Sequence, residues 1–304
     1  MPSGGLRIGT RASPLALAQA REMARLLAEA GHPGADLVPM RTTGDKITDR
    51  PLIAAGGKGL FTKEIDEALL SGEVDLAVHS AKDMPTRLPD GLIIAACLER
   101  EDVRDAFLSP VARTLRDLPL GARLGTSSLR RKALALRLRP DLEVVDLRGN
   151  VETRLRKLGE GIADATLLAS AGLRRLGLID RATSLIDVAD WLPASGQGAI
   201  AIVVREDSPT RAIVAAIDHA ATSTALAAER AFLTVLDGSC RTPIGALAEL
   251  DGDGLRFRGI IVKPDGSAAH DVARSGSIAD AAALGSDAGA ELARRGGADF
   301  FSTG

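Results

Sequence analysis

The sequence predicts an α/β fold in two lobes, followed by a smaller α+β domain. Up to Val204, short apolar runs alternate with amphipathic helical patterns, which is typical of β-α-β units with helices on both faces of a mostly parallel sheet. After Thr222 the pattern changes to one helix, two strand-like runs and a final helix. This change indicates a separate α+β unit, because the β-α-β spacing is lost.

The first lobe is expected to begin with a strand at residues 6–10. Ser13 and Pro14 suit an N-cap and a first helical position, so a helix should run from there to a stop near Gly31. Pro39 lies in the next apolar run and indicates an edge strand or a strand end, because proline donates no hydrogen bond. A further helix and two strands are expected at residues 63–70, 74–78 and 92–97.

The charged segment at residues 99–105 interrupts this pattern, and we interpret it as a linker. The β-α alternation then restarts over roughly ninety residues, which is a plausible domain size. The expected strands lie at residues 123–125, 142–147 and 165–169, and the helices start at Ser128 and Val151. After a Gly/Pro break at residues 192–198, we expect a strand at 199–204, a helix at 225–236, strands at 244–250 and 255–262, and a helix at 278–294.

Composition excludes several classes of protein. The 304 residues include 38 Lys and Arg against 40 Asp and Glu, so no basic excess favours non-specific binding to nucleic acid or membranes. Aromatic residues make up only 2%, with no Tyr, which argues against a stacking platform for single strands. Two cysteines cannot form a disulfide framework, and no apolar run approaches the roughly 18 residues of a membrane helix. We therefore expect a cytoplasmic protein.

Four strand-to-helix turns, at residues 9–14, 79–85, 125–131 and 147–154, carry residues that suit an anion. Three of them offer small or hydroxyl residues that can begin a helix, where backbone N–H groups favour negative charge. Each turn also places Arg or Lys nearby, and Arg captures carboxylates in a bidentate manner. An isolated Arg pair is more often a solvated surface, but four such turns on one scaffold weaken that explanation. The cations are Arg11, Lys82, Arg130, Arg131, Arg148 and Arg154.

The two cysteines differ in their surroundings. Cys97 ends an apolar strand and is most simply a buried small hydrophobic residue. Cys240 lies in a predicted turn beside Arg241, and a nearby cation favours the reactive thiolate. From these residues alone, an inert and a reactive Cys240 remain equally open. The four scattered His residues and the two Cys residues form no zinc-binding pattern, so no metal is expected.

Taken together, the motifs resemble those of the porphobilinogen deaminases, also called hydroxymethylbilane synthases. The matching segments run in the family's order from Arg7 to Gly245: RIGTRASPLALAQA, GGKGLFTKEID, DLAVHSAKDMPT, CLEREDVRDAF, GTSSLRR, DLRGNVETRL, AGLRRLGL, GQGA, AERAF and LDGSCRTPIG. The resemblance implies two lobes like those of periplasmic binding proteins and a small α+β domain. It places lobe one at residues 1–98 and 198–218, lobe two at 103–193, and the cofactor-anchoring domain at 221–304.

The resemblance also implies an activity. Enzymes of this family condense four porphobilinogen molecules head to tail, with loss of ammonia, and release hydroxymethylbilane. Their covalent dipyrromethane cofactor is attached through a thioether to a cysteine that matches Cys240 here. The family's catalytic aspartate matches Asp83, and a carboxylate against pyrrole N–H groups would stabilise the positive charge that develops there. A monomer is the default expectation.

Motif matches imply further site residues. The cofactor-binding residues would be Cys240, Lys82, Asp83, Ser127, Ser128, Arg130, Arg131, Arg148, Gly149 and Arg154. The substrate-binding residues would be Arg11, Ser13, Ser80, Thr126, Arg148 and Gln197. Residues 56–60 would form a flap, with Lys58 and Phe61 near the cleft. The sequence departs from the family where Ser239 precedes the cysteine in place of glycine, where a lysine before the flap is missing, and where Ala201 and Val203 replace the usual Gly-x-Glu.

Two other classes of function remain as alternatives. A non-catalytic, two-lobed anion-binding protein would have no use for Cys240 or for a third domain, and its intact mass would match the bare sequence. A nucleic-acid binder that uses the Arg turns would lose affinity steeply with salt. The missing aromatics and the net charge of −2 disfavour this second alternative.

Overall fold

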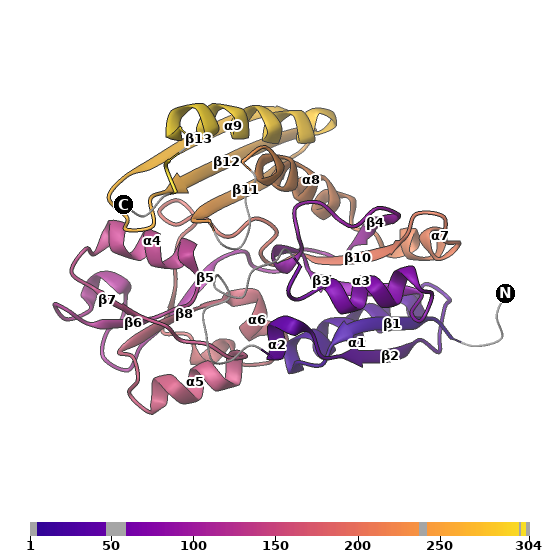
Figure 1. Ribbon diagram of the computed structural model, residues 1–304, viewed down its shortest axis with the longest axis horizontal. Helices are drawn as coiled ribbons and strands as arrows, with labels where there is room; N and C mark the ends of the chain where they lie inside the picture. The colour runs from indigo at the N-terminus through magenta and orange to yellow at the C-terminus, as the bar shows by residue number, and fades with distance from the viewer. Residues whose placement is uncertain (1–4, 47–58, 237–241, 298, 302–304) are drawn as a thin grey trace. The chain divides into compact units, whose positions relative to one another are not determined.

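Each β-sheet of the protein belongs to one of two units of the chain. Unit 1 comprises residues 1–101 and 198–223, and unit 2 comprises residues 102–197 and 224–304. In the part of the chain that the structure describes, unit 1 holds one five-stranded sheet, and unit 2 holds a five-stranded and a three-stranded sheet (Figure 1). This structure is a computed structural model that describes residues 5–46, 59–236, 242–297 and 299–301.

The sheet of unit 1 has the strand order β2-β1-β3-β10-β4. β1 runs parallel to β2 and β3, whereas β10 is antiparallel to β3 and β4. Because β4 pairs antiparallel with β10, it runs in the same direction as β1, β2 and β3, so four of the five described strands are parallel to one another, as predicted. β10 alone runs the opposite way, because it enters the sheet after the long excursion through unit 2 and not through a β-α-β crossover. Pro39 lies on the edge strand β2, as predicted. The strands are β1 (Arg7–Arg11), β2 (Asp36–Met40), β3 (Leu76–Ser80), β4 (Leu92–Cys97) and β10 (Ile200–Arg205).

Helices and short turns flank this sheet. The Ser13 side chain accepts a hydrogen bond from the Ala16 backbone N at 3.3 Å, and Pro14 takes the first helical position, as predicted for the start of α1. Met23 of this helix is fully buried against Ile202 and other aliphatic residues of the sheet. The elements are α1 (Pro14–Glu29), α2 (Thr43–Lys46), α3 (Lys63–Leu70), α7 (Thr210–Val214) and the 3-10 turns η1 (Ala81–Asp83) and η4 (Ala215–Ile217).

The five-stranded sheet of unit 2 has the order β7-β6-β8-β5-β9. β6 is parallel to β7 and β8, and β5 is antiparallel to β8 and β9, so this sheet is mixed as well. β5 begins at Asp105, which the sequence had placed in a linker. The strands are β5 (Asp105–Leu108), β6 (Arg123–Gly125), β7 (Glu143–Val145), β8 (Ala165–Ala169) and β9 (Ser184–Leu185). The helices are α4 (Leu129–Leu138), α5 (Val151–Gly159) and α6 (Ser170–Arg175), with 3-10 turns η2 (Leu115–Asp117) and η3 (Ile179–Arg181).

The three-stranded sheet of unit 2 is antiparallel in the order β11-β12-β13. Its strands are β11 (Ile244–Asp251), β12 (Gly254–Val262) and β13 (Ala269–Ser277), and its helices are α8 (Ala220–Val235) and α9 (Ala281–Gly296), which the turn η5 (Ile278–Asp280) precedes. Phe232 of α8 packs on Phe257 of β12, with ring centroids 5.1 Å apart, and α9 lies along the same sheet (Figure 1). β13 escaped prediction because its sequence, AHDVARSGS, contains no apolar run.

These features confirm the predicted fold class. Two α/β sheets with flanking helices are followed by a small α+β part, although both α/β sheets are mixed. No helix in the described ranges has the length and apolar character needed to cross a membrane.

Candidate functional site

In unit 1 the structure brings the first two predicted turns together. Arg11 ends β1, and Asp83 lies in the turn that follows β3, the strand adjacent and parallel to β1. Their side chains meet at this edge of the sheet, with Arg11 Nη1 3.8 Å from Asp83 Oδ2. The same guanidinium pairs with Asp45 and lies 4.3 Å from the ring centroid of Phe61. Arg11 is therefore fixed by an ion pair and by a cation–π contact.

A cavity of about 40 Å³ lies at this end of the sheet. Five of the predicted residues line it: Arg11, Ser13, Phe61, Ser80 and Asp83. Gln19, another lining residue, donates from Nε2 to the Ser80 hydroxyl at 2.9 Å. Lys82 stands next to Asp83 in the same turn but does not line the cavity.

Carboxylates surround the single guanidinium of Arg11. Burial tends to raise the pKa of Asp45, but the hydrogen bonds and charge of Arg11 outweigh it and hold this pKa below its ordinary value. Asp45 therefore remains an anion and neutralises Arg11. Asp83 adds a second carboxylate that is about one-third exposed, so a substrate group that carries positive charge can reach it.

In unit 2 the predicted arginine pair is buried and not exposed on a groove. Arg130 and Arg131 follow Ser128, which caps α4, and each donates from Nη2 to a different oxygen of Asp105 at 2.7 Å. Their other terminal nitrogens donate to the backbone carbonyls of Leu192 and Leu167 at 2.8 and 2.9 Å. Each guanidinium is thereby held in one orientation at the start of the helix.

Asp105 is the centre of this buried cluster, although the sequence analysis assigned it to a linker. It also accepts hydrogen bonds from Trp191 Nε1 at 2.7 Å and from Gln197 Nε2 at 2.9 Å. Burial alone would raise its pKa, but the charges of Arg130 and Arg131 hold the pKa of Asp105 well below its ordinary value. Two guanidinium groups around one carboxylate leave the cluster with an excess of one positive charge.

The hydroxyl residues of the GTSS turn build the loop in front of this cluster. Thr126 Oγ1 accepts from the Ser128 backbone N at 3.2 Å, and Ser128 Oγ accepts from the Arg131 backbone N at 3.4 Å. Ser127 Oγ donates to the Leu147 carbonyl at 3.0 Å and so links this turn to the next one. These hydroxyls shape the turn, and their backbone groups lie at a helix N-terminus that favours an anion.

The turn between β7 and α5 presents the remaining predicted cations. Arg148 Nε lies 3.3 Å from Asp146 Oδ2, and Arg154 Nε donates to the Gly149 carbonyl at 2.9 Å. Gly149 has φ +118°, and an added Cβ would lie 2.5 Å from the Thr153 side chain, so the turn requires glycine. Both arginines are half-buried, and Arg148 directly follows Leu147, whose carbonyl accepts the hydrogen bond from Ser127.

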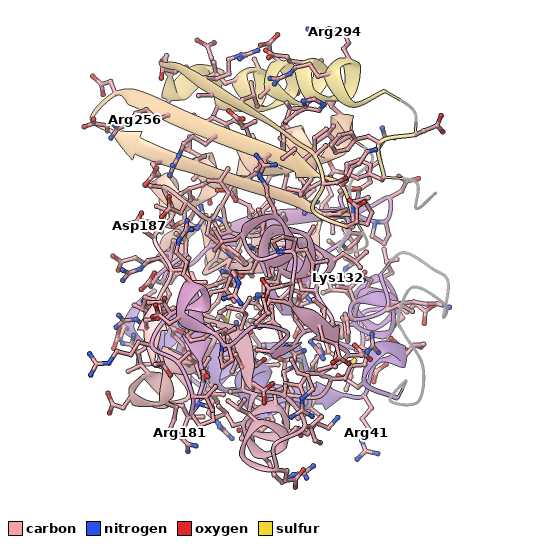
Figure 2. All side chains as sticks on the ribbon, turned by 90° about the vertical axis from the view of Figure 1, so that its left-hand side faces the viewer. Arg41, Lys132, Arg181, Asp187, Arg256 and Arg294 are labelled. Carbon is pink, nitrogen blue, oxygen red and sulfur yellow. The ribbon has the colours of Figure 1, made fainter. Side chains whose placement is uncertain are left out.

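Charged side chains on the surface differ in exposure from the buried residues of the Asp105 cluster. Figure 2 labels Arg41, Arg181 and Arg256 among others, and these side chains point away from the ribbon into solvent. Arg130 and Arg131 are only 5% and 6% exposed. A charged side chain that is buried to this degree almost always has a specific partner or ligand.

Two predicted residues, Lys58 and Cys240, lie outside the described residues. Cys97 is fully buried at the end of β4, as expected for a small hydrophobic residue. In the described ranges no group of three or more His, Cys, Asp or Glu side chains could hold a metal ion. Asp105 and Trp191 are the residues of this cluster that the sequence analysis missed, and the signal for Asp105 was a carboxylate at the end of a charged segment, directly before the apolar run of β5.

Comparison with protein families gives two matches. Residues 6–212 match the family model described as "Porphobilinogen deaminase, dipyromethane cofactor binding domain", and residues 223–294 match "Porphobilinogen deaminase, C-terminal domain". The chain is 58% identical over 299 residues to proteins named porphobilinogen deaminase from Nitrobacter hamburgensis and from Nitrobacter winogradskyi. Each alignment covers 97% of this chain and 95% of the relative.

Solved structures show a more distant likeness. A periplasmic substrate-binding protein of an ABC transporter from Coxiella burnetii is 19% identical with a TM-score of 0.43, over 74% of this chain and 96% of that one. Immunogenic lipoprotein A from Vibrio vulnificus is 14% identical with a TM-score of 0.45, over 72% of this chain and 97% of that one.

Proposed function

Because the chain belongs to the porphobilinogen deaminase family, we propose that its two clusters divide the family's reaction between them. The protein is a transferase that condenses four porphobilinogen molecules head to tail into hydroxymethylbilane, with loss of ammonia, and its cofactor is a dipyrromethane. The cluster around Asp83 handles the positive charge of the reacting group. The cluster around Asp105 holds the carboxylates of the pyrroles.

Asp83 is the catalytic carboxylate in this proposal. When the aminomethyl nitrogen of porphobilinogen leaves, positive charge develops on the pyrrole ring, and a nearby carboxylate stabilises it. Arg11 at 3.8 Å orients Asp83, and Ser13 and Ser80 line the adjoining cavity and can bind polar groups of a substrate whose pyrrole ring stays outside it, together with Arg11. The Arg11–Asp83 pair on this cavity is the observation that carries the proposal.

The residues of unit 2 fit a dipyrromethane. Each pyrrole of such a group carries acetate and propionate side chains, and the Asp105 cluster has an excess of positive charge beside a helix N-terminus. When bound, the cofactor supplies the pyrrole carbon to which the first substrate unit is added. The residues that would hold it are Lys82, Asp83, Ser127, Ser128, Arg130, Arg131, Arg148, Gly149 and Arg154, and Thr126, Arg148 and Gln197 would add substrate contacts.

Cys240 is the proposed attachment site of the cofactor. It belongs to a proposed cofactor-anchoring domain at residues 221–304. The two proposed lobes are lobe one, at residues 1–98 and 198–218, and lobe two, at residues 103–193. Lys58 and Phe61 are proposed to flank the substrate as parts of a flap. The balanced charge and the two cysteines of the sequence support a cytoplasmic monomer that binds neither nucleic acid nor membrane. Light scattering of the purified enzyme would give one chain per particle if this is right.

Intact mass tests the cofactor and its attachment. The purified protein should exceed its sequence mass by one dipyrromethane and should react with an acidic aldehyde reagent for pyrroles. Cys240→Ala should remove both signals, whereas Cys97→Ala, the change at the other cysteine, should keep them. A wild-type protein of bare sequence mass, or a Cys240→Ala protein that still carries the adduct, would overturn the assignment.

Turnover tests the role of Asp83. Asp83→Ala should lower the rate of hydroxymethylbilane formation by at least about 100-fold, because the carboxylate stabilises charge that exists mainly in the transition state. Asp90→Ala removes an exposed carboxylate of the same unit and should change the rate little. Circular dichroism of both variants checks that they fold. A near-normal rate in Asp83→Ala would refute this role.

A further inference from the structure

A group of three buried polar side chains beside the cavity of unit 1 has no part in the function described above. Thr62 precedes α3, Asp66 lies on α3, and His79 lies on β3. These residues are only 1%, 4% and 5% exposed, respectively. Thr62 Oγ1, Asp66 Oδ1 and His79 Nε2 make no hydrogen bond within the described residues. A buried polar atom without a partner is costly, so three in one place indicate an occupant.

The spacing of these atoms limits the size of the occupant. Asp66 Oδ1 and His79 Nε2 are 4.0 Å apart, too far to bond each other directly. One atom placed beside both can lie within hydrogen-bond distance of each. Thr62 and His79 also line the cavity of about 40 Å³ that Asp83 lines. This volume admits a small molecule such as water or ammonium but no pyrrole ring.

The charges at this site favour a cation. Burial raises the pKa of Asp66 to about 6; the Thr62 hydroxyl opposes this rise and the negative charge of Glu67 adds to it, so Asp66 is mostly ionised at neutral pH. Burial and the charge of Arg11 lower the pKa of His79 to about 4, so its imidazole is neutral there. His79 therefore carries no charge that could balance the negative charge of Asp66. Arg11, the nearby guanidinium, is already paired with Asp45 and faces Asp83.

The chemistry of the three atoms selects a hydrogen-bond donor. A carboxylate oxygen only accepts, a neutral imidazole nitrogen without hydrogen accepts, and a hydroxyl oxygen can accept. Water could satisfy these atoms but would leave the charge of Asp66 uncompensated. Anions are excluded by the carboxylate. An ammonium ion has the required size, the charge and four N–H donors.

We propose that Thr62, Asp66 and His79 bind one ammonium ion, the nitrogen product of each condensation. The inference rests on the proposed function, because the condensation is the source of this ion. The carbon–nitrogen bond of the protonated aminomethyl group breaks and a carbon–carbon bond forms. The ammonia released takes up the proton that the attacking pyrrole carbon gives up, so one ammonium ion forms for each unit added. The site accepts this ion beside the cavity that Asp83 lines.

Binding of ¹⁵N-labelled ammonium to the purified holoenzyme tests the proposal directly. Proton exchange of a buried ammonium ion is slow, so the wild-type protein should give a bound ¹H–¹⁵N signal in NMR spectra against a background of sodium chloride. Asp66→Asn should weaken this binding at least about tenfold, because it removes a charged acceptor. Asp90→Asn removes an exposed carboxylate of the same unit and should leave the binding unchanged.

A second variant and a competing cation provide further tests of the ammonium site. If Asp66→Asn does not fold, Thr62→Val, which removes one acceptor and keeps the side chain's shape, should weaken the binding instead. Methylammonium, which carries a methyl group in place of one N–H, should not displace the labelled ion. A wild-type protein that binds no ammonium, an Asp66→Asn protein that binds it normally, or equal binding of methylammonium would overturn the proposal. Hydroxymethylbilane formation by the wild-type protein is measured separately, so its loss would count against the proposed function and not against this site.

Discussion

The Asp105 cluster of unit 2 and the Arg11 cluster of unit 1 use the same residue types in opposite proportions. In unit 2, one carboxylate is enclosed by two arginines, and Asp105 is only 1% exposed. In unit 1, one arginine meets two carboxylates, and the side chains of Arg11, Asp45 and Asp83 are 22%, 24% and 35% exposed. Unit 2 therefore suits an anion, and unit 1 suits a group that becomes positive.

We propose that this difference suits the two kinds of charge that porphobilinogen carries. Porphobilinogen carries carboxylates on its ring and an ammonium group on its aminomethyl carbon. The buried arginines of unit 2 can hold carboxylates without moving, because Asp105 and backbone carbonyls already fix their orientation. Asp83 of unit 1 is more exposed, so it can face a charge that develops only during the reaction. In the proposed function, a rigid anion site and an accessible carboxylate would serve different steps.

The largest effect should come from removing the carboxylate of unit 2. Asp105→Asn leaves two buried guanidinium groups without their counter-charge and should lower the free energy of unfolding by about 3–5 kcal/mol. Urea denaturation followed by circular dichroism measures this change. Trp191 is the one tryptophan of the chain and bonds to Asp105, so its fluorescence should report the disturbed cluster even in the folded protein.

Asp45→Asn is the matched change in unit 1. Its carboxylate also pairs with an arginine, but the pair is partly exposed, so the loss should be only about 1 kcal/mol. Equal losses of unfolding free energy for the two variants would show that the difference in burial does not make the two clusters differ in stability.

A second test uses the pH dependence of the free energy of unfolding, to which Asp66 and His79 of unit 1 contribute. Asp66 has a pKa raised from 3.8 to about 6 in the folded protein, so it adds stability as the pH falls through this range. His79 has a pKa lowered from 6.5 to about 4, so it removes stability over nearly the same range. The two effects largely cancel in the wild-type protein.

Asp66→Asn removes the compensating carboxyl group and should reveal the loss of stability at low pH that His79 causes. Between neutral pH and pH 4, the variant should lose about 2–3 kcal/mol more stability than the wild type, measured by urea denaturation in ammonium-free buffer. Asp90→Asn, which removes an exposed carboxylate of the same unit, should follow the wild-type curve. Parallel curves for wild type and Asp66→Asn would contradict the opposed pKa shifts.

The sequence was sufficient to locate the turns but not the partners of their side chains. Ser13, Ser128 and the GTSS and RGN segments were predicted because caps, glycine turns and strand ends leave local signals. Asp105 was assigned to a linker because its neighbours are charged, and only the sheet brings it to residues 25 to 92 positions away. Asp66 had a weak signal, since it stands between Ile65 and Leu69 on the apolar face of α3, yet its neighbour His79 could not be inferred.

The smallest predicted effect tests whether the Arg148–Arg154 turn of unit 2 is held locally, in contrast to the long-range Asp105 cluster. Asn150 caps α5 through Oδ1, which accepts from the Thr153 backbone N at 2.8 Å. Asn150→Ala removes this bond at an exposed position and should lower the free energy of unfolding by about 1 kcal/mol, measured by urea denaturation. Asn150→Ser restores a capping oxygen and should recover most of the loss. A loss as large as that of Asp105→Asn would mean that the turn is coupled to the buried cluster, through the Ser127–Leu147 hydrogen bond, and is not an independent local structure.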